Sequence, residues 1–339
     1  MTAPAPVPAL PSTPAVLSTP AVPSAGRTRL RLTVARIEPL TEDVRQLTLV
    51  PRDGSRLPSH PPGSHLGLIW QPAPERVNSY SLTGDGDSPA AYTVSVLRVP
   101  GGNGGSAWAH GLRPGDEIDA VPPRSTFPVA ARARRHLLVA GGIGITPLLS
   151  HARWHVRWGA DFALYYAHRP GRAAHLDELR SLCGDRLRAS AGRESLWAGL
   201  GPALRRQPLG TQLYVCGPLG LIGAVTGAAQ SARWAASRVR SEAFGISADG
   251  PRAPFRVTRA GQQDIHVSAA ETLLEALERS GAGVRSLCRS GVCGECRTPL
   301  AGGRADHRDL VLSAAEKAAG HWIMPCVSRA ADEELELAP

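Results

Sequence analysis

Four cysteines near the C-terminal end constrain the fold of this 339-residue chain more than any other feature. Cys288, Cys293 and Cys296 follow a C-x4-C-x2-C spacing, and Cys326 is a distant fourth thiol. A zinc ribbon uses two C-x2-C pairs, and a disulfide scaffold is normally a short secreted chain. The observed spacing is that of a plant-type [2Fe–2S] cluster. We therefore expect these four thiolates to hold such a cluster, with a structural zinc site as the alternative.

The net charge of +9 is unevenly distributed along the chain. From residue 246 onward there are 11 Lys and Arg against 13 Asp and Glu, whereas the preceding part has 27 against 16. An acidic module beside a basic body suggests parts or partners that meet through complementary fields. The basic residues lack the interleaved aromatic residues of a single-strand binder, so we expect no nucleic-acid partner.

The length of the apolar runs and the number of cysteines indicate the cellular compartment. No apolar run is long enough to cross a bilayer, and six cysteines in 339 residues are too few for a disulfide scaffold. We therefore expect no membrane partner and a reducing, cytoplasmic location.

The composition and periodicity of the sequence change three times along its length. The first 25 residues contain seven prolines and no charge, which predicts a disordered extension over residues 1–27. Short alternating runs between turn residues predict an antiparallel barrel or sandwich over 28–133. Strands that alternate with helices predict a parallel α/β domain over 134–245. Residues 246–339 contain two short strands, the cysteine loop, and a helix that we expect to begin at a Ser268–Glu271 capping box and to end at Gly281.

Two motifs lie at strand ends of the expected α/β domain. GGIGITP, residues 141–147, places glycines where backbone can approach a diphosphate, and Thr146 is expected to cap the following helix, with Pro147 in its first turn. YVCGP, residues 214–218, is expected to expose Cys216 at the rim of the sheet, where ligands of open α/β sheets bind. A purely structural turn and a buried spare thiol are the respective alternatives.

Two further motifs lie in the β-rich part. In NSYSLTGD, residues 78–85, Tyr80 can lie on a flat ring while Ser81 bonds a polyol or a ring edge. In GGNGGSAW, residues 101–108, the turn at 104–106 can offer N–H and hydroxyl donors to a phosphate.

Together, YSL, GGS, GGIGITP, CGP and CRSGVCGEC…C occur in an order that resembles the phthalate dioxygenase reductase family of the ferredoxin–NADP reductase superfamily. The resemblance covers about residues 28–339. It implies an FMN-binding antiparallel barrel over 28–133, an NAD-binding parallel α/β domain over 134–245 and a C-terminal β-grasp ferredoxin domain over 246–339. FAD and NADPH are the alternative cofactors.

The resemblance also implies roles for individual residues. Residues with implied flavin contacts are Asn78, Tyr80, Ser81, Ser95, Val96, Leu97, Gly104, Gly105 and Ser106. Residues with implied nucleotide contacts are Gly142, Gly144, His168, Arg169, Gly217 and Pro218. Residues implied to lie at the reacting rings are Thr146, Cys216 and Phe244. The chain departs from the family at Asn78, where the R-x-Y-S flavin motif has arginine; Arg76 lies two residues earlier.

The function implied is an electron relay from NADH through FMN and the [2Fe–2S] cluster to a separate oxygenase. The flavin is needed between them because a hydride carrier cannot serve a one-electron acceptor directly. A Rieske-type oxygenase is the favoured partner and a cytochrome P450 the alternative. The remaining alternatives are a self-sufficient NADH oxidase that acts on a small acceptor such as O2, and a redox sensor without turnover.

Overall fold

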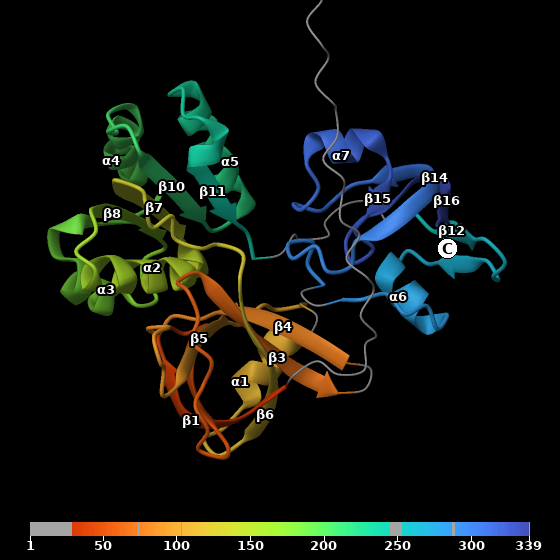
Figure 1. Ribbon diagram of the computed structural model, residues 1–339, viewed down its shortest axis with the longest axis horizontal. Helices are drawn as coiled ribbons and strands as arrows, with labels where there is room; N and C mark the ends of the chain where they lie inside the picture. Colours follow the sequence, from red (N-terminus) through yellow and green to blue (C-terminus); the bar gives the residue numbers. More distant parts are fainter. Residues whose placement is uncertain (1–28, 73–74, 103, 245–252, 287–288, 339) are drawn as a thin grey trace, which may run out of the picture.

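The computed structural model describes residues 29–72, 75–102, 104–244, 253–286 and 289–338. The expected extension over residues 1–27 and the expected cluster ligand Cys288 therefore lie outside the described residues. The described residues form three sheets, and each sheet takes its strands from one of the three expected parts (Figure 1).

The first sheet is antiparallel and has the order β4-β3-β6-β1-β2-β5. Its elements are β1 (Leu30–Pro39), β2 (Val44–Pro51), β3 (Ser64–Pro72), β4 (Glu75–Ser81), β5 (Tyr92–Leu97), helix α1 (Gly105–Gly111) and β6 (Glu117–Ser125). Alternate side chains such as Leu32, Val34, Leu47 and Leu49 are buried in one core, as the period of a strand requires. A bridge between Leu82 and Val94 joins the two edges, so the sheet curls into the expected barrel.

The second sheet is parallel, with the order β11-β10-β7-β8-β9. Its elements are β7 (Arg135–Gly141), the 3-10 turn η1 (Gly142–Gly144), α2 (Ile145–Arg157), β8 (Phe162–His168), α3 (Leu176–Cys183), η2 (Gly184–Arg186), β9 (Leu187–Ala191), α4 (Arg193–Arg205), β10 (Thr211–Cys216), α5 (Leu219–Ser231), η3 (Ala236–Arg238) and β11 (Val239–Glu242).

Both faces of this parallel sheet are covered. Leu148 of α2 and Leu179 of α3 pack on one face, whereas Leu200 of α4 and Val225 of α5 pack on the other. The strand order reverses between β7 and β10, and the loops after these two strands therefore diverge to form the crevice where such sheets bind ligands.

The third sheet has the order β13-β12-β16-β14-β15. Its elements are β12 (Phe255–Arg259), β13 (Ile265–Val267), α6 (Leu273–Arg279), β14 (Thr298–Asp306), α7 (Ala314–Ala319), β15 (Trp322–Ile323) and β16 (Arg329–Leu337). Strand β12 pairs antiparallel with β13 and runs parallel to β16. Leu273 and Leu277 of α6 pack into the core of this sheet.

Two expected helix starts are wrong. Helix α6 begins four residues later than expected, because Thr272 and Glu275 form its capping box, while Ser268 contributes only a backbone N–H that donates to Glu271. Helix α2 begins at Ile145 after Gly144, without a side-chain cap. The Thr146 hydroxyl instead donates to the carbonyl of Ile143 at 3.0 Å.

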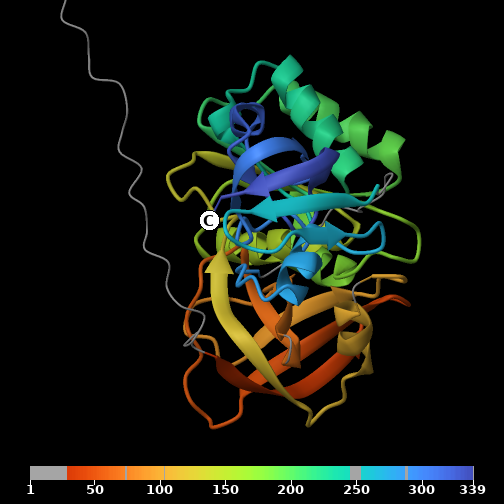
Figure 2. The ribbon, with the colours of Figure 1, turned by 90° about the vertical axis from the view of Figure 1, so that its right-hand side faces the viewer.

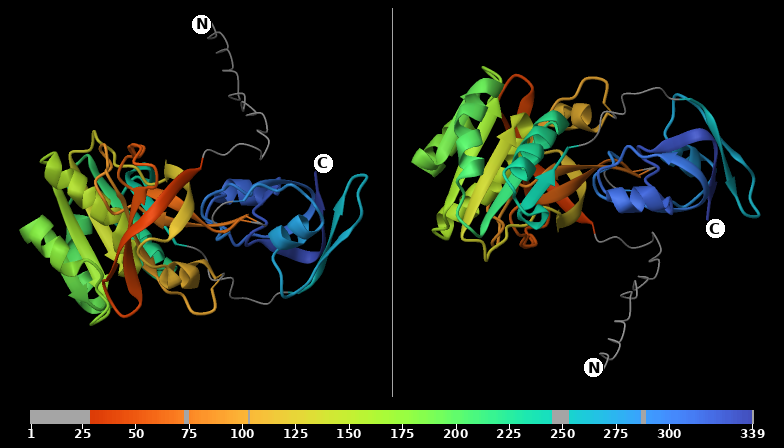
Figure 3. Two further views of the ribbon diagram at one scale, coloured as in Figure 1. Left: turned by 90° about the horizontal axis from the view of Figure 1, so that it is seen from below. Right: turned by 90° about the horizontal axis from the view of Figure 1, so that it is seen from above.

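The barrel forms the base of the molecule, and the other two sheets lie above it (Figures 1 and 2). Seen from below and above, β3 and β4 extend toward the C-terminal module (Figure 3). There Cys293 packs against Ile69, Val77 and Val121 of the barrel. Within the described residues, no helix has the length and apolar character needed to cross a bilayer.

Candidate functional site

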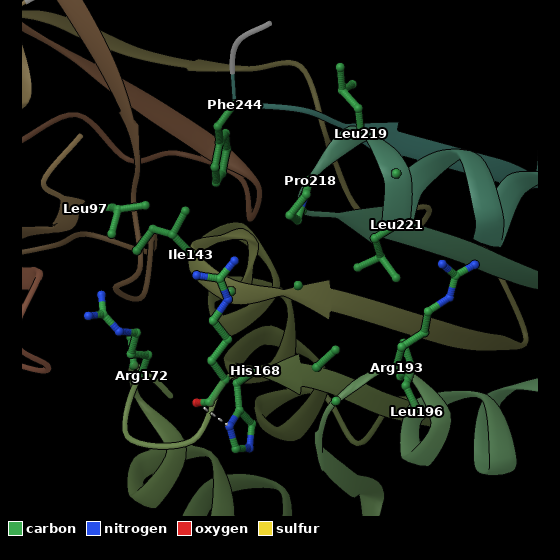
Figure 4. A pocket seen from close by; sticks show the side chains of 18 of the residues that line it. Leu97, Ile143, His168, Arg172, Arg193, Leu196, Pro218, Leu219, Leu221 and Phe244 are labelled. Atoms are coloured by element: carbon green, nitrogen blue, oxygen red, sulfur yellow. Dashed lines mark hydrogen bonds between the residues drawn. The ribbon is translucent and has the colours of Figure 1, made fainter. Parts of the chain in front are cut away.

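A cavity of about 560 Å³ lies between the barrel and the carboxyl edge of the parallel sheet (Figure 4). The barrel supplies Asp43, Val44 and Leu97, and the α/β domain supplies most of the remaining lining. In Figure 4, Phe244 projects into the space between Leu97 and Pro218. The lining brings together seven of the residues singled out from the sequence: Leu97, Gly142, His168, Arg169, Gly217, Pro218 and Phe244.

The glycines after β7 are needed because this turn presses against the end of β10. Gly142 has a φ of +54°, which favours glycine. A Cβ on Gly144 would lie 2.3 Å from the carbonyl oxygen of Cys216. Glycine at these positions therefore lets the loops after β7 and β10 meet at the floor of the cavity.

Cys216 is not exposed at the rim, so the exposure expected from the sequence is wrong. Its side chain is fully buried, and burial, reinforced by the Glu242 carboxylate, raises the pKa of the thiol well above its ordinary value. The strand ends where expected, but the thiol turns into the core between sheet and helices. Thr146 is also buried, and neither side chain belongs to the cavity lining.

The end of the cavity beyond His168 is rich in arginine. Arg172 pairs with Glu42 at 3.1 Å and with Asp43. Arg169 and Arg193 also line the cavity, and within the described residues neither makes an ion pair. Two uncompensated guanidinium groups suit a ligand that carries phosphate charge.

Sequence reasoning missed several lining residues, including Asp43, Arg172 and Arg193. It also missed Glu242, which ends β11 beside Cys216. Burial raises the pKa of the Glu242 carboxyl to about 7, against a hydrogen bond from the Thr126 hydroxyl at 3.3 Å. The sequence signal for Glu242 was its position: a carboxylate at the carboxyl end of a parallel strand, two residues before Phe244.

The residues expected around the flavin phosphate come together in the barrel. The Trp70 indole N–H donates to the Asn78 side chain at 3.1 Å. A Cβ on Gly104 would lie 3.2 Å from Trp70, and one on Gly105 would lie 2.5 Å from Asn78. Ser106 lies in the same turn and accepts a hydrogen bond from the Val99 N–H.

The side chains of the other residues expected to contact the flavin are mostly buried. Burial raises the pKa of Tyr80 to about 12, and its buried hydroxyl has no hydrogen-bond partner among the described residues. Ser81 is buried near the end of β4, and Val96 packs into the barrel core. The Ser95 hydroxyl lies 2.8 Å from His175 of the α/β domain. The close packing of Gly104 against Trp70 and of Gly105 against Asn78 fits a phosphate cradle, whereas the Val96 side chain is buried in the barrel core.

The cysteine loop fits an iron–sulfur cluster. Cys296 and Cys326 are buried with their sulfur atoms 3.3 Å apart, close to the roughly 3.7 Å between two thiolates on one tetrahedral metal. Within the described residues no three ligating side chains surround one point, and Cys288 lies outside these residues. The spacing of Cys296 and Cys326 fits two thiolates on one iron of a four-cysteine cluster.

A barrel, a nucleotide-type cavity at its boundary with a parallel sheet, and a cysteine-loop module in one chain define a modular electron-transfer reductase. Known proteins support this class. Residues 116–239 match the family described as dimethylamine monooxygenase subunit DmmA-like, N-terminal domain. Residues 257–331 match the 2Fe-2S iron-sulfur cluster binding domain.

Similar proteins cover nearly the whole chain. The heme-dependent oxidative N-demethylase beta subunit of Ectopseudomonas mendocina (strain ymp) is 42% identical over 89% of this chain and 96% of its own. The phthalate dioxygenase reductase of Burkholderia cepacia is 35% identical over 91% and 97%. A solved structure of phthalate dioxygenase reductase has a TM-score of 0.76 at 33% identity, over 92% of this chain and 98% of that one.

The chain belongs to the phthalate dioxygenase reductase family. It is an NADH-dependent oxidoreductase that uses a flavin, FMN in this family, and a [2Fe–2S] cluster to supply electrons to a separate oxygenase component.

Proposed function

We propose that this chain is the reductase component of an oxidative N-demethylase system, in which it supplies electrons to a haem-dependent oxygenase that acts on a methylated amine. The proposal is carried by the 42% identity, over 96% of its length, to the beta subunit of a heme-dependent oxidative N-demethylase. The match of residues 116–239 to a dimethylamine monooxygenase family adds support. We place the reaction in the cytoplasm, where NADH is available.

The residues of the cavity take separate roles in this proposal. The glycine turns at 141–144 and 217–218 bring backbone close to the nucleotide diphosphate, and Arg169 and Arg193 neutralise its charge. Leu97, Ile143 and Phe244 exclude water where the nicotinamide meets the flavin. Phe244 is 44% exposed, so its ring is accessible to cover the flavin.

The barrel and the C-terminal module hold the other two redox groups. The turn at 104–106 with Asn78 and Tyr80 would bind the flavin, and Cys288, Cys293, Cys296 and Cys326 would hold the cluster, with Cys296 and Cys326 close enough to share a metal. A flavin held there would supply the conversion of hydride transfer into single-electron transfer. The domain boundaries that we propose are 27/28, 133/134 and 245/246.

The first test combines a spectrum with a coupled assay. We expect NADH to bleach both flavin and cluster absorbance of the anaerobic protein. With a haem-dependent oxygenase and a methylated amine, we expect formaldehyde in proportion to NADH consumed, because oxidation of an N-methyl carbon releases it. NADH consumption without formaldehyde, together with efficient coupling to a Rieske-type oxygenase or a cytochrome P450, would reassign the partner. Equal turnover without any partner protein would favour an oxidase.

A further inference from the structure

Four side chains form a hydrogen-bonded chain across the boundary between the barrel and the α/β domain. The Ser95 hydroxyl of β5 lies 2.8 Å from Nε2 of His175, and Nδ1 of His175 lies 2.9 Å from a carboxylate oxygen of Glu178. Glu178 also pairs with Arg153 of α2. Arg153 then donates to the carbonyl of Thr83 at 2.7 Å. This series of hydrogen bonds therefore begins and ends in the barrel. Strand β5 of the barrel lies below α2 and α3 (Figure 1).

Ser95 and His175 are buried, so their hydrogen bond cannot be replaced by water. Ser95 is 4% exposed and His175 is 6% exposed, so a missing partner would leave a polar group without water. Because an ionised Glu178 only accepts, Nδ1 of His175 donates to it, and Nε2 of the same ring pairs with the Ser95 hydroxyl. Burial opposes ionisation of Glu178, but the hydrogen bond from His175 and the charge of Arg153 hold its pKa below its ordinary value.

The backbone at His175 also indicates a constrained position. Its φ of +62° is in the left-handed region, which non-glycine residues seldom adopt. Its carbonyl accepts from the N–H of Leu179 in the first turn of α3. A residue in this conformation persists where its surroundings fix it, and here the contacts with Ser95 and Glu178 do so.

This series of hydrogen-bonded side chains lies directly behind two walls of the cavity. Leu97, on the same side of β5 as Ser95, lines the barrel wall, and Ala174, next to His175, lines the α/β wall. The ion pairs between these domains, such as Arg157 with Asp87 at 2.9 Å, are more exposed than Ser95 and His175. Exposed pairs of this kind contribute little rigidity.

We infer that Ser95 and His175 are positioning residues that fix the separation of the two cavity walls and thereby hold the nicotinamide in register with the flavin. The inference rests on the proposed use of this cavity for NADH. Displacement of a bound reactant by about 1 Å can slow a reaction by about 100-fold. The hydroxyl of Ser95 thus acts through His175 and not as a direct contact of the flavin.

The first experiment measures the coupling across the boundary without any cofactor chemistry. In the full-length protein, hydrogen–deuterium exchange is followed in a peptide covering residues 172–183. Ser95→Ala removes one oxygen atom from the other domain, and we expect it to accelerate exchange in this peptide at least tenfold. Ser95→Thr keeps a hydroxyl and should retain slow exchange. Arg157→Ala removes an exposed pair at the same boundary and should leave the peptide unchanged. Unchanged exchange in Ser95→Ala would overturn the inference.

The second experiment separates positioning from binding. For Ser95→Ala and for His175→Phe, we expect the limiting rate of flavin reduction at saturating NADH to fall at least tenfold, with less than a twofold change in Kd for NADH. The double variant should be no slower than the slower single variant. Independent, multiplicative losses would show that Ser95 acts on the flavin directly and would overturn the inference. Absence of flavin reduction in the unmodified protein would instead refute the proposed function.

Discussion

At the level of single residues, the Glu242 carboxyl at the end of β11 has a raised pKa. Burial raises the pKa of its carboxyl from 4.5 to about 7, and the Thr126 hydroxyl only partly offsets this effect. One carboxylate oxygen has no hydrogen-bond partner among the described residues. Protonation of the carboxyl near neutral pH therefore relieves the cost of a buried charge.

This shift predicts how stability depends on pH. Below about pH 4.5 the carboxyl is protonated in both folded and unfolded chains. Between about pH 4.5 and 7 only the unfolded chain releases the proton, so folding stability falls as pH rises. We expect Glu242→Gln to match the wild type at the lowest pH and to be more stable by up to about 3 kcal/mol at pH 8. Denaturant unfolding at several pH values measures this difference.

The matched control is Glu194→Gln, because Glu194 is an exposed carboxylate of the same domain. Its stability relative to the wild type should stay within about 0.5 kcal/mol across the pH range. A Glu242→Gln variant with the same pH profile as the wild type would contradict the buried titration.

At the level of elements, the start of helix α6 shows how two similar signals compete. Ser268 and Glu271, and Thr272 and Glu275, both have the capping-box spacing. The structure selects the second pair: the Thr272 hydroxyl accepts from the Glu275 N–H at 3.1 Å, and the Glu275 carboxylate accepts from the Thr272 N–H at 2.9 Å. The choice places Leu273 and Leu277 in the core.

The two sites can be compared by substitution. Thr272→Ala removes the side-chain cap and should destabilise the C-terminal module by about 1 kcal/mol. Ser268→Ala should cost less than about 0.5 kcal/mol, because only the Ser268 backbone N–H bonds to Glu271. Thermal unfolding followed through the cluster absorbance reports both variants. Equal losses would contradict the assigned helix start.

At the level of the whole molecule, the C-terminal module contacts the barrel through its cysteine loop. Cys293 packs on the apolar patch of Ile69, Val77 and Val121, and Arg124 of the barrel pairs with Glu295 of the loop at 3.4 Å. This pair joins the basic body to the acidic module, as the charge distribution of the sequence suggested. The contact places Cys293, a proposed cluster ligand, against the barrel.

Removal of the C-terminal module should separate the two halves of the relay. A chain without residues 246–339 should oxidise NADH with an artificial acceptor within about threefold of the intact rate, because the barrel and the parallel sheet have separate cores. It should produce no detectable product with the oxygenase. The full-length Cys326→Ser variant, which loses one cluster ligand, should behave in the same way. Coupling retained in either variant would remove the cluster from the electron pathway.

The sequence by itself determined the features that depend on local pattern. Cysteine spacing indicated the cluster, period-two runs indicated the barrel strands, and the glycines of residues 141–144 marked a turn that lines the cavity. These features follow from residues close in sequence, whose spacing alone restricts backbone geometry.

The tertiary structure decided which side chains reach the site. Cys216 is buried although its strand ends at the sheet rim, and Ser95 bonds to His175, 80 residues away. Glu242 acquired its raised pKa only through burial at the end of the sheet. Each of these outcomes depends on how separate elements pack against one another, and packing between distant segments leaves no period or spacing in the chain.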